Sequence, residues 1–308
     1  MKYIVGIDGG GTKTTCIFAD ESGKSLLKTT GGASSFLTTS TDNAASNIIS
    51  IVKSGLTKLG ASFEDILIIL AGIAGAGRKT HADNLRESIL RKVPAGFMNL
   101  FIESDARIAI EGALAGETGA VLIAGTGSII FGKDNSGEFH RAGGFGRLIG
   151  DEGGGYSIGI RTLNLISRMI DGREAEGEIL KKFSTIFHIN NDDDLISLVH
   201  NSGFDVSSIA MFTIKSAGEG LAEAVSILDR ESYELINHIL VIKNKLGLSP
   251  LKLVLVGSLI ENDNFYSQLL RMKIKRIKDV KLYEKKFSPE MGAVIMAKQI
   301  LSTNKSIQ

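Results

Sequence analysis

Residues 3–14 read YIVGIDGGGTKT, an apolar run that ends in an aspartate followed by three glycines. The apolar run predicts a short buried strand, and the glycines predict a turn that bulkier residues could not form. A second apolar run follows at residues 14–19, and Asp20-Glu21-Ser22-Gly23 closes it. This order of strand, turn and strand predicts a β-hairpin at the start of the chain.

The hairpin pattern occurs twice. At a constant offset of 114 positions (125 − 11), a set of turn residues repeats: Gly11, Thr12, Asp20, Ser22 and Gly23 return as Gly125, Thr126, Asp134, Ser136 and Gly137. Short apolar strands at residues 66–70, 100–102 and 251–256 accompany helix-length periodic segments in both halves. We therefore expect two related α/β lobes, with equivalent strand ends facing a central cleft where such folds bind ligands.

Length and periodicity set the expected domains. The chain has 308 residues, 43% of them hydrophobic, which is enough for two cores. We expect an amino-terminal lobe at residues 1–115, a carboxy-terminal lobe at 116–288 and a closing helix within 289–308 that could pack back on the first lobe. The second lobe should carry a helical insertion at about 151–247, with helices at residues 157–170, 174–183, 192–200 and 219–245. The polar tail at 302–308 is expected to fray.

Composition argues against several classes of partner. The chain has 35 Lys and Arg against 34 Asp and Glu, so its net charge of +1 gives no bulk attraction to nucleic acid or anionic membranes. No stretch reaches the roughly 18 apolar residues of a membrane span, and the first residues lack a signal-peptide pattern. Cys16 lies in an apolar run and is interpreted as a core residue. We expect a cytoplasmic protein that binds small molecules or copies of itself. The histidines show no zinc spacing: His81, His140, His188, His200 and His238.

The first glycine turn contains the groups of a phosphate site. Successive glycines expose backbone N–H groups to phosphate oxygens, and Asp8 at the strand end would hold hydrated Mg²⁺. The segment does not match the Walker A pattern, and a plain hairpin turn would need neither Asp8 nor three glycines. Residues 124–128 repeat the arrangement, with Thr126 and Ser128 as hydroxyl donors. Two such turns would bind a polyphosphate from both sides.

Carboxylates follow two other strands. Asp105 comes after the strand at 100–102 and opens a helix, so it is either a helix cap or a group aimed at a bound hydroxyl. Asp151 and Glu152 lie in a stretch at 143–155 that contains seven glycines. They could merely complement a helix dipole, but so many glycines favour a close approach of the backbone to a ligand.

These motifs, in this order, resemble the actin, hexokinase and heat-shock-chaperone ATPase superfamily. The specific resemblance is to the BadF/BadG/BcrA/BcrD ATPase branch, which contains N-acetylglucosamine kinase and the acyl-CoA reductase activators. It runs nearly end to end, with phosphate motifs at residues 7–14 and 123–128, an adenosine motif at 255–258 and a closing helix at 288–293. The resemblance implies an α/β fold with two ribonuclease H-like lobes, ATP and Mg²⁺ as cofactors, and a homodimer.

The resemblance also implies residue roles. Asp105 would be the general base, Asp151 would hold sugar hydroxyls, and Asp8 would bind Mg²⁺ through water. The implied ATP contacts are Gly10, Gly11, Thr12, Lys13, Thr126, Gly127, Gly257, Ser258 and Gly292. The implied sugar contacts are Ser35, Asp105, Gly125, Thr126, Phe145 and Asp151.

The implied activity is ATP-dependent phosphorylation of a hexose or amino-sugar hydroxyl, with conversion of N-acetylglucosamine to its 6-phosphate as the first choice. Ser35 and Phe145 stand where many sugar kinases of this branch have Asn and Trp, so glucose, glucosamine and N-acetylmuramic acid stay open as substrates. One alternative is a broad-specificity hexokinase. Others are an activator ATPase, which would need cluster cysteines beyond Cys16, and a nucleotide-binding sensor without sugar turnover.

Overall fold

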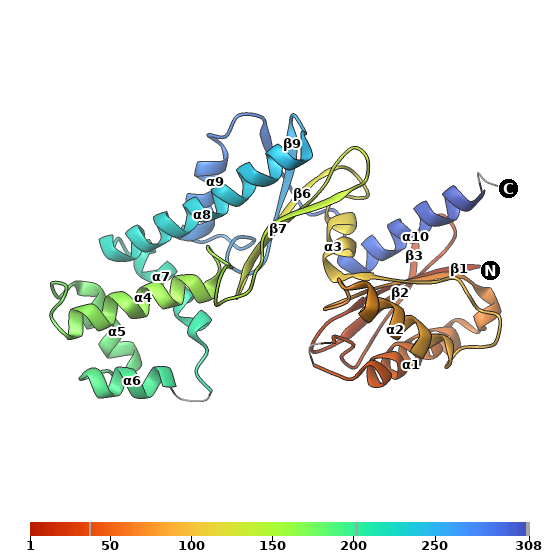
Figure 1. Ribbon diagram of the computed structural model, residues 1–308, viewed down its shortest axis with the longest axis horizontal. Coiled ribbons are helices and arrows are strands. Elements are labelled where there is room, and N and C mark those ends of the chain that lie inside the picture. The colour runs from red at the N-terminus through yellow and green to blue at the C-terminus, as the bar shows by residue number, and fades with distance from the viewer. Residues whose placement is uncertain (37, 201–202, 306–308) are drawn as a thin grey trace. The chain divides into compact units, whose positions relative to one another are not determined.

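The chain folds into two units, each built on one mixed five-stranded sheet (Figure 1). The structure is a computed structural model that describes residues 1–36, 38–200 and 203–305. One unit combines Met1–Thr118 with Glu284–Gln308, and the other is Gly119–Tyr283. The chain therefore leaves the first unit and returns to it at the end.

The first sheet has the order β3-β2-β1-β4-β5. Its strands are β1 (Tyr3–Gly9), β2 (Thr14–Ala19), β3 (Ser25–Gly31), β4 (Ile66–Ile73) and β5 (Leu100–Ser104). The pairs β1–β2 and β2–β3 are antiparallel, whereas β1–β4 and β4–β5 are parallel. The predicted amino-terminal hairpin is confirmed.

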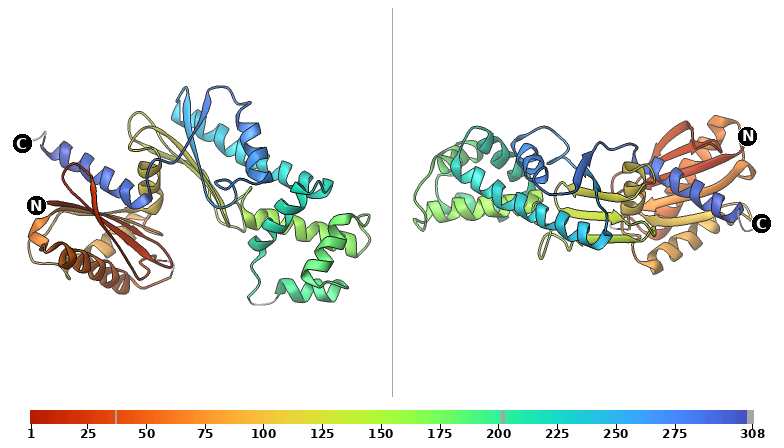
Figure 2. Two further views of the ribbon diagram at one scale, coloured as in Figure 1. Left: turned by 180° about the vertical axis from the view of Figure 1, so that it is seen from behind. Right: turned by 90° about the horizontal axis from the view of Figure 1, so that it is seen from above.

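Helices cover both faces of this sheet, as Figure 2 shows. They are α1 (Thr41–Leu59), α2 (Lys79–Leu90), α3 (Asp105–Ala113) and α10 (Pro289–Lys305), with a short 3-10 turn at Phe63–Asp65. Side chains alternate along β1, so Val5 packs with α1 and α2 while Ile4 packs with α3 and α10. Cys16 is fully buried and burial raises the pKa of its thiol to about 12, which confirms its interpretation as a core residue.

The second sheet repeats the first. Its order is β10-β9-β6-β7-β8, which is the same arrangement when β6 is matched to β1. The strands are β6 (Gly119–Ala124), β7 (Ser128–Lys133), β8 (Phe139–Gly143), β9 (Leu251–Val256) and β10 (Val280–Tyr283). The pairs β6–β7 and β7–β8 are antiparallel and β6–β9 and β9–β10 parallel, as in the first sheet. The duplication and the two-lobed α/β fold predicted from the sequence are confirmed, while a cleft between the lobes stays a prediction.

Between β8 and β9 the described chain is helical, as expected for the insertion (green to cyan in Figure 1). The helices are α4 (Gly155–Ile170), α5 (Glu178–Phe187), α6 (Asp192–His200), α7 (Ile209–Gly218) and α8 (Ala222–Leu246), with a 3-10 turn at Val206–Ser208. Helix α9 (Phe265–Ile274) lies between β9 and β10. No helix within the described ranges has both the length and the hydropathy needed to cross a membrane.

Two helices begin later than predicted, one helix was not predicted, and the last helix extends further than predicted. The helix expected at 174–183 begins only at Glu178, because Gly177 is its extended amino-terminal cap. The helix expected at 219–245 begins at Ala222, because Gly220 has a φ of +92° and interrupts the chain after α7. Helix α7 itself was not predicted, since it is apolar on most sides and shows no amphipathic stripe. Helix α10 continues through Lys305, so the prediction that the tail frays is wrong for residues 302–305. Residues 306–308 lie outside the described residues.

Candidate active site

Charged side chains gather around Asp8 at the carboxyl end of β1. Burial, and after it the nearby carboxylates of Glu290 and Asp105, raise the pKa of Asp8 to about 6, against the opposing effect of Lys13 and Lys28. These groups come from β1, β3, α3, α10 and the glycine turn. Three carboxylates and two ammonium groups in one place form a site suited to a cation and to phosphate oxygens.

Hydrogen bonds to the loop after β3 hold the first glycine turn in place. The Gly10 N–H donates to the Lys13 carbonyl at 3.0 Å, and the Gly10 carbonyl accepts from the N–H groups of Ser34 and Ser35 at 3.1 and 3.2 Å. The Thr14 hydroxyl donates to the Gly32 carbonyl and contacts the Ser34 hydroxyl, both at 2.6 Å. Residues 11–13 are exposed. Hydrogen bonds therefore fix the base of the turn, while residues 11–13 are accessible to a ligand.

Glu290 and Lys28 are functional candidates that the sequence analysis missed. Lys28 Nζ lies 2.6 Å from Glu290 Oε1, and the Glu290 side chain is only 4% exposed. Burial alone would raise the pKa of Glu290, but hydrogen bonds, led by the one from Lys28, bring it below its ordinary value. The two residues are 262 positions apart in the chain, so no local pattern could have paired them.

Asp105 is not the cap of α3. The cap is Ser104, whose hydroxyl accepts from the Arg107 N–H at 3.3 Å. Asp105 is the exposed first residue of the helix, and its Oδ1 accepts from the Ala106 N–H at 2.9 Å. Because Ser104 serves as the cap, the capping explanation does not account for Asp105.

Ser35 is placed differently from an ordinary sugar ligand. Its side chain is 1% exposed, and its hydroxyl donates to the Ala74 carbonyl at 3.3 Å. The neighbouring Phe36 N–H donates to the same carbonyl at 3.1 Å. Ser35 thus fastens the loop after β3 to the end of β4, and its contact with a sugar stays a prediction.

The second glycine turn is held by the start of α4. The Gly155 N–H donates to the Gly125 carbonyl at 2.8 Å, and the Tyr156 N–H donates to the Thr126 carbonyl at 2.9 Å. The Thr126 side chain is exposed, in keeping with its predicted role. Ser128, expected as a phosphate donor, is buried and its hydroxyl donates to the Glu152 carbonyl, so it supports the glycine-rich loop.

Asp151 packs directly on this turn. A Cβ atom added to Gly127 would lie 2.3 Å from Asp151 Oδ2, so only glycine fits there. Asp151 Oδ1 accepts from the Gly146 N–H at 3.1 Å. Phe145, next to Gly146, is 63% exposed, and the Arg141 guanidinium lies 5.1 Å from its ring centroid. The structure therefore brings Gly127, Phe145 and Asp151 together within the second unit.

Gly257 and Gly292, which the resemblance assigns to the nucleotide, both pack closely against backbone atoms. Gly257 has a φ of +107°, and an added Cβ would lie 2.3 Å from the Ala124 carbonyl oxygen, just before the second turn. Ser258 beside it is exposed. Gly292 lies in the first unit, where an added Cβ would lie 1.9 Å from the Ile108 carbonyl oxygen. The crossing of α3 and α10 therefore explains Gly292, and its contact with a nucleotide stays a prediction.

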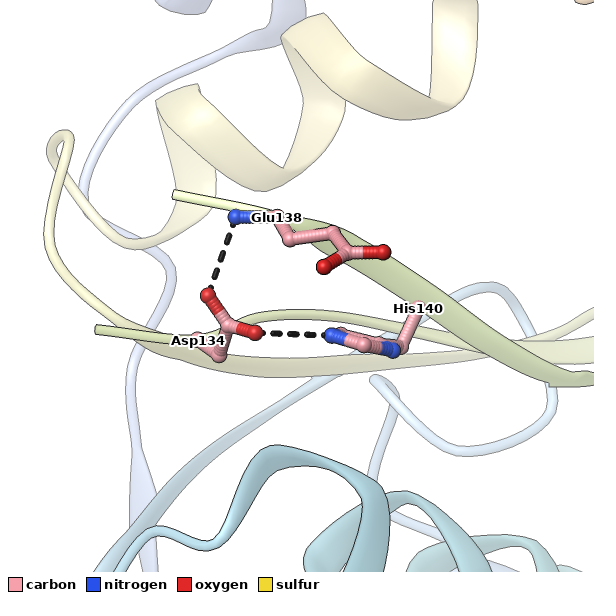
Figure 3. Close-up of side chains that lie close together, drawn as sticks. All are labelled: Asp134, Glu138 and His140. Carbon is pink, nitrogen blue, oxygen red and sulfur yellow. Dashed lines mark hydrogen bonds and ion pairs between the residues drawn. The ribbon is translucent and has the colours of Figure 1, made fainter. Parts of the chain in front are cut away.

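One cluster outside these motifs combines two carboxylates and a histidine (Figure 3). Asp134, Glu138 and His140 each offer a ligand atom within 4.8 Å of the others, and Asp134 Oδ2 lies 2.8 Å from His140 Nε2. Asp134 Oδ1 also accepts from the Ser136 and Glu138 N–H groups, both at 2.9 Å. Asp20 makes the equivalent bonds to residues 22 and 24 in the first hairpin. Because the first hairpin has this turn without the histidine, the shared role of the aspartate is to close the hairpin.

Comparison with known proteins gives consistent results. The family model of the BadF/BadG/BcrA/BcrD ATPase family matches residues 5–297. The curated N-acetylmuramic acid/N-acetylglucosamine kinase of Clostridium acetobutylicum is 32% identical over 97% of this chain and 99% of its own length. The N-acetyl-D-glucosamine kinase of Dictyostelium discoideum is 28% identical over 96% of this chain and 98% of its own. A solved structure from Chromobacterium violaceum has a TM-score of 0.70 at 20% identity and covers 96% of this chain and 99% of that one, which shows a shared fold.

Proposed function

This chain belongs to the BadF/BadG/BcrA/BcrD ATPase family, and we propose that it is an ATP-dependent kinase of an amino-sugar hydroxyl. The preferred reaction converts N-acetylglucosamine to N-acetylglucosamine 6-phosphate. The observation that carries the proposal is the 32% identity, over nearly the full length of both chains, to a kinase named for N-acetylmuramic acid and N-acetylglucosamine. The carboxylate cluster around Asp8 supplies the chemistry that such a kinase requires.

Asp105 is the proposed general base. It is exposed at the start of α3 and close enough to Asp8 to affect its pKa. A carboxylate in this position can accept the proton of the sugar hydroxyl as that oxygen attacks the γ-phosphate of ATP. Positioning and charge stabilisation account for most of the catalysis in phosphoryl transfer, so a single base is sufficient.

Mg²⁺ fits the residues around Asp8. Carboxylate oxygens are its preferred protein ligands. Burial and the neighbouring carboxylates of Glu290 and Asp105 raise the pKa of Asp8, and a bound cation would favour its ionised form. Asp8 would hold the ion through water, and the ion would neutralise charge on the phosphates. Lys13 and Lys28 add positive charge close enough to Asp8 to oppose the rise in its pKa.

The remaining residues are proposed to bind the two substrates. Gly10 with the exposed residues 11–13, and the turn with Thr126 and Gly127, would contact the phosphates of ATP, and Gly257 and Ser258 the nucleoside. Gly292, which the resemblance also assigns to ATP, would act by letting α10 pack closely on α3. The sugar would be held by Asp151, with Gly125, Thr126, Phe145 and Ser35 as its other contacts. The close packing of Asp151 on Gly127 supports a shared role in placing the sugar beside the phosphates.

The proposal also includes a homodimer and a cytoplasmic location. The homodimer rests on the family resemblance. The location fits the phosphoryl donor, because ATP is a cytoplasmic metabolite.

The first test is a coupled ADP-release assay with Mg·ATP. The panel is N-acetylglucosamine, glucosamine, glucose, mannose, N-acetylmannosamine and N-acetylmuramic acid, with a reaction lacking sugar as the control. Release that depends on N-acetylglucosamine supports the preferred reaction. Equal or better turnover of N-acetylmuramic acid favours the second candidate, a dual-specificity kinase, which the name of the Clostridium acetobutylicum relative supports. Equal release with and without every sugar would refute the kinase proposal.

A further inference from the structure

The loop that carries Asp151 has a conformation that needs support from outside. Asp151 has a φ of +61° and Gly153 a φ of +80°, both in the left-handed region. Non-glycine residues adopt this conformation uncommonly, although aspartate tolerates it better than most, so contacts with its surroundings help to hold Asp151 there. The loop also lies against the second glycine turn, since a Cβ added to Gly154 would be 2.6 Å from the Gly127 carbonyl carbon.

Two buried side chains hold the Gly153 residue from both sides. Its N–H donates to Glu231 Oε2 at 2.6 Å, and its carbonyl accepts from the Tyr266 hydroxyl at 2.9 Å. Glu231 in α8 and Tyr266 in α9 are both 0% exposed. Burial, with the charge of Glu231, raises the pKa of Tyr266 well above its usual range, so its hydroxyl keeps the proton that it donates.

Glu231 also connects this loop to the helix that holds the phosphate turn. Its other oxygen, Oε1, accepts from Arg161 Nε in α4. The first turn of α4 donates through Gly155 and Tyr156 to the Gly125 and Thr126 carbonyls. The Glu231 side chain is fully buried and that of Arg161 is partly exposed, and an ion pair of this kind adds little net stability compared with apolar packing of the same volume. Stability alone therefore does not explain a glutamate at this point.

We propose that Glu231 and Tyr266 are positioning residues that fix the Gly153 peptide and thereby place Asp151 for the sugar. The expected effect on the sugar KM rests on the proposed function. The expected effect on the loop rests only on the hydrogen bonds of Glu231 and Tyr266 to Gly153. Neither residue contacts a substrate in this scheme. Their effect is transmitted through the loop at residues 150–155.

The test compares Tyr266→Phe with wild type in sugar and ATP titrations. Loss of one buried hydrogen bond to the loop should raise the KM for the sugar about five- to tenfold. The KM for ATP should change less than about twofold, because the contacts of α4 with the glycine turn are kept. Glu231→Ala should raise the sugar KM more than Glu231→Gln, since the amide oxygen of Gln can still accept from the Gly153 N–H.

The matched control is Thr213→Val. Thr213 is fully buried in the same unit and lies 2.7 Å from the Thr162 hydroxyl, so the variant also loses a buried hydrogen bond, but not one to the loop. Tm is measured for every variant. A sugar KM that rises in Tyr266→Phe and not in Thr213→Val, at similar Tm, supports the proposal. A sugar KM within about twofold of wild type in Tyr266→Phe, or equal changes in the control, overturns it.

Hydrogen exchange separates this inference from the proposed function. In the protein without substrates, Tyr266→Phe should speed exchange of the amides at residues 151–156 while Thr213→Val leaves them protected. If wild type shows no sugar-dependent ADP release, the proposed function fails, and the exchange result alone decides whether the two residues hold the loop. Unchanged exchange in Tyr266→Phe would overturn the inference even in an active kinase.

Discussion

Asp8→Asn should make the protein more stable and inactive, and the gain in stability should depend on pH. The pKa of Asp8 is raised from an ordinary 3.8 to about 6 in the folded protein, chiefly by burial and next by Glu290 and Asp105. A raised pKa means that ionising Asp8 costs more in the folded state than in the unfolded state. Asparagine has a similar shape and carries no charge, so it removes this cost.

The size of the effect follows from the two pKa values. The difference between about 6 and 3.8 is about 2 units, which corresponds to about 3 kcal/mol at pH values well above 6. Below pH 3.8 Asp8 is protonated in both states, so the wild type bears none of this cost. The free energy of unfolding of the wild type then falls as the pH rises from 3.8 to about 6, and above about 6 the cost is constant. At about pH 5 roughly half of the cost is present, so the gap between variant and wild type should widen by about 1.4 kcal/mol from about pH 5 to about pH 8. Solvent contact at Asp8 screens its charge, so we expect a widening on the order of 1 kcal/mol.

The assay is thermal unfolding of both proteins without nucleotide or metal, at about pH 5 and about pH 8. On this scale the Tm difference should grow by about 2–4 °C toward the higher pH. Asp20→Asn is the control, because hydrogen bonds from Ser22 and Lys24 lower the pKa of Asp20 and its loss should destabilise the protein. An Asp8→Asn variant no more stable than wild type at about pH 8, or a gap that narrows as pH rises, would refute this reasoning. Sugar-dependent ADP release should be lost at both values.

Three further outcomes are expected. Asp105→Asn should lower kcat by about 10²–10⁴-fold, measured by ADP release, with sugar affinity kept by calorimetry; near-normal turnover would show that Asp105 is not the base. Gly127→Ala places a Cβ 2.3 Å from Asp151 Oδ2 and should raise the sugar KM about tenfold or more; an unchanged KM would separate Asp151 from the sugar site. Gly292→Ala places a Cβ 1.9 Å from the Ile108 carbonyl oxygen, so Tm should fall, with a destabilisation of about 1–3 kcal/mol. The KM for ATP, measured on the folded fraction, should stay at the wild-type value. A rise in the KM for ATP without a fall in Tm would instead assign Gly292 to the nucleotide.

The features predicted correctly from the sequence are those that depend on neighbouring residues. The two hairpins were found because Asp20 and Asp134 close their turns with bonds to residues only two and four positions away. Strand β9 was predicted with its observed bounds, Leu251–Val256, because its apolar run is short and sharply bounded. Both kinds of signal are local, so a single sequence contains them in full.

The features that were missed depend on distant residues. Lys28 meets Glu290 across 262 positions, and Glu231 meets Gly153 across 78. A lone lysine in a strand and a lone glutamate in a long helix carry no local sign of their partners. Helix α7 was missed for a related reason, since burial on most of its sides removes the polar stripe that marks a surface helix.

The glycines show what a motif can and cannot establish. Resemblance assigns Gly127, Gly257 and Gly292 to ligands, yet in each case an added Cβ would lie within 2.3 Å of another part of the protein. The neighbour of Gly127 is Asp151, itself a proposed sugar ligand, so packing and binding are the same requirement there. For Gly292 the neighbour is the backbone of α3, which begins with Asp105. A glycine at that crossing lets α10 approach the helix that carries the proposed base, and it can therefore matter to catalysis without touching ATP. Motif residues of this kind are better assigned by separating KM from Tm than by resemblance alone.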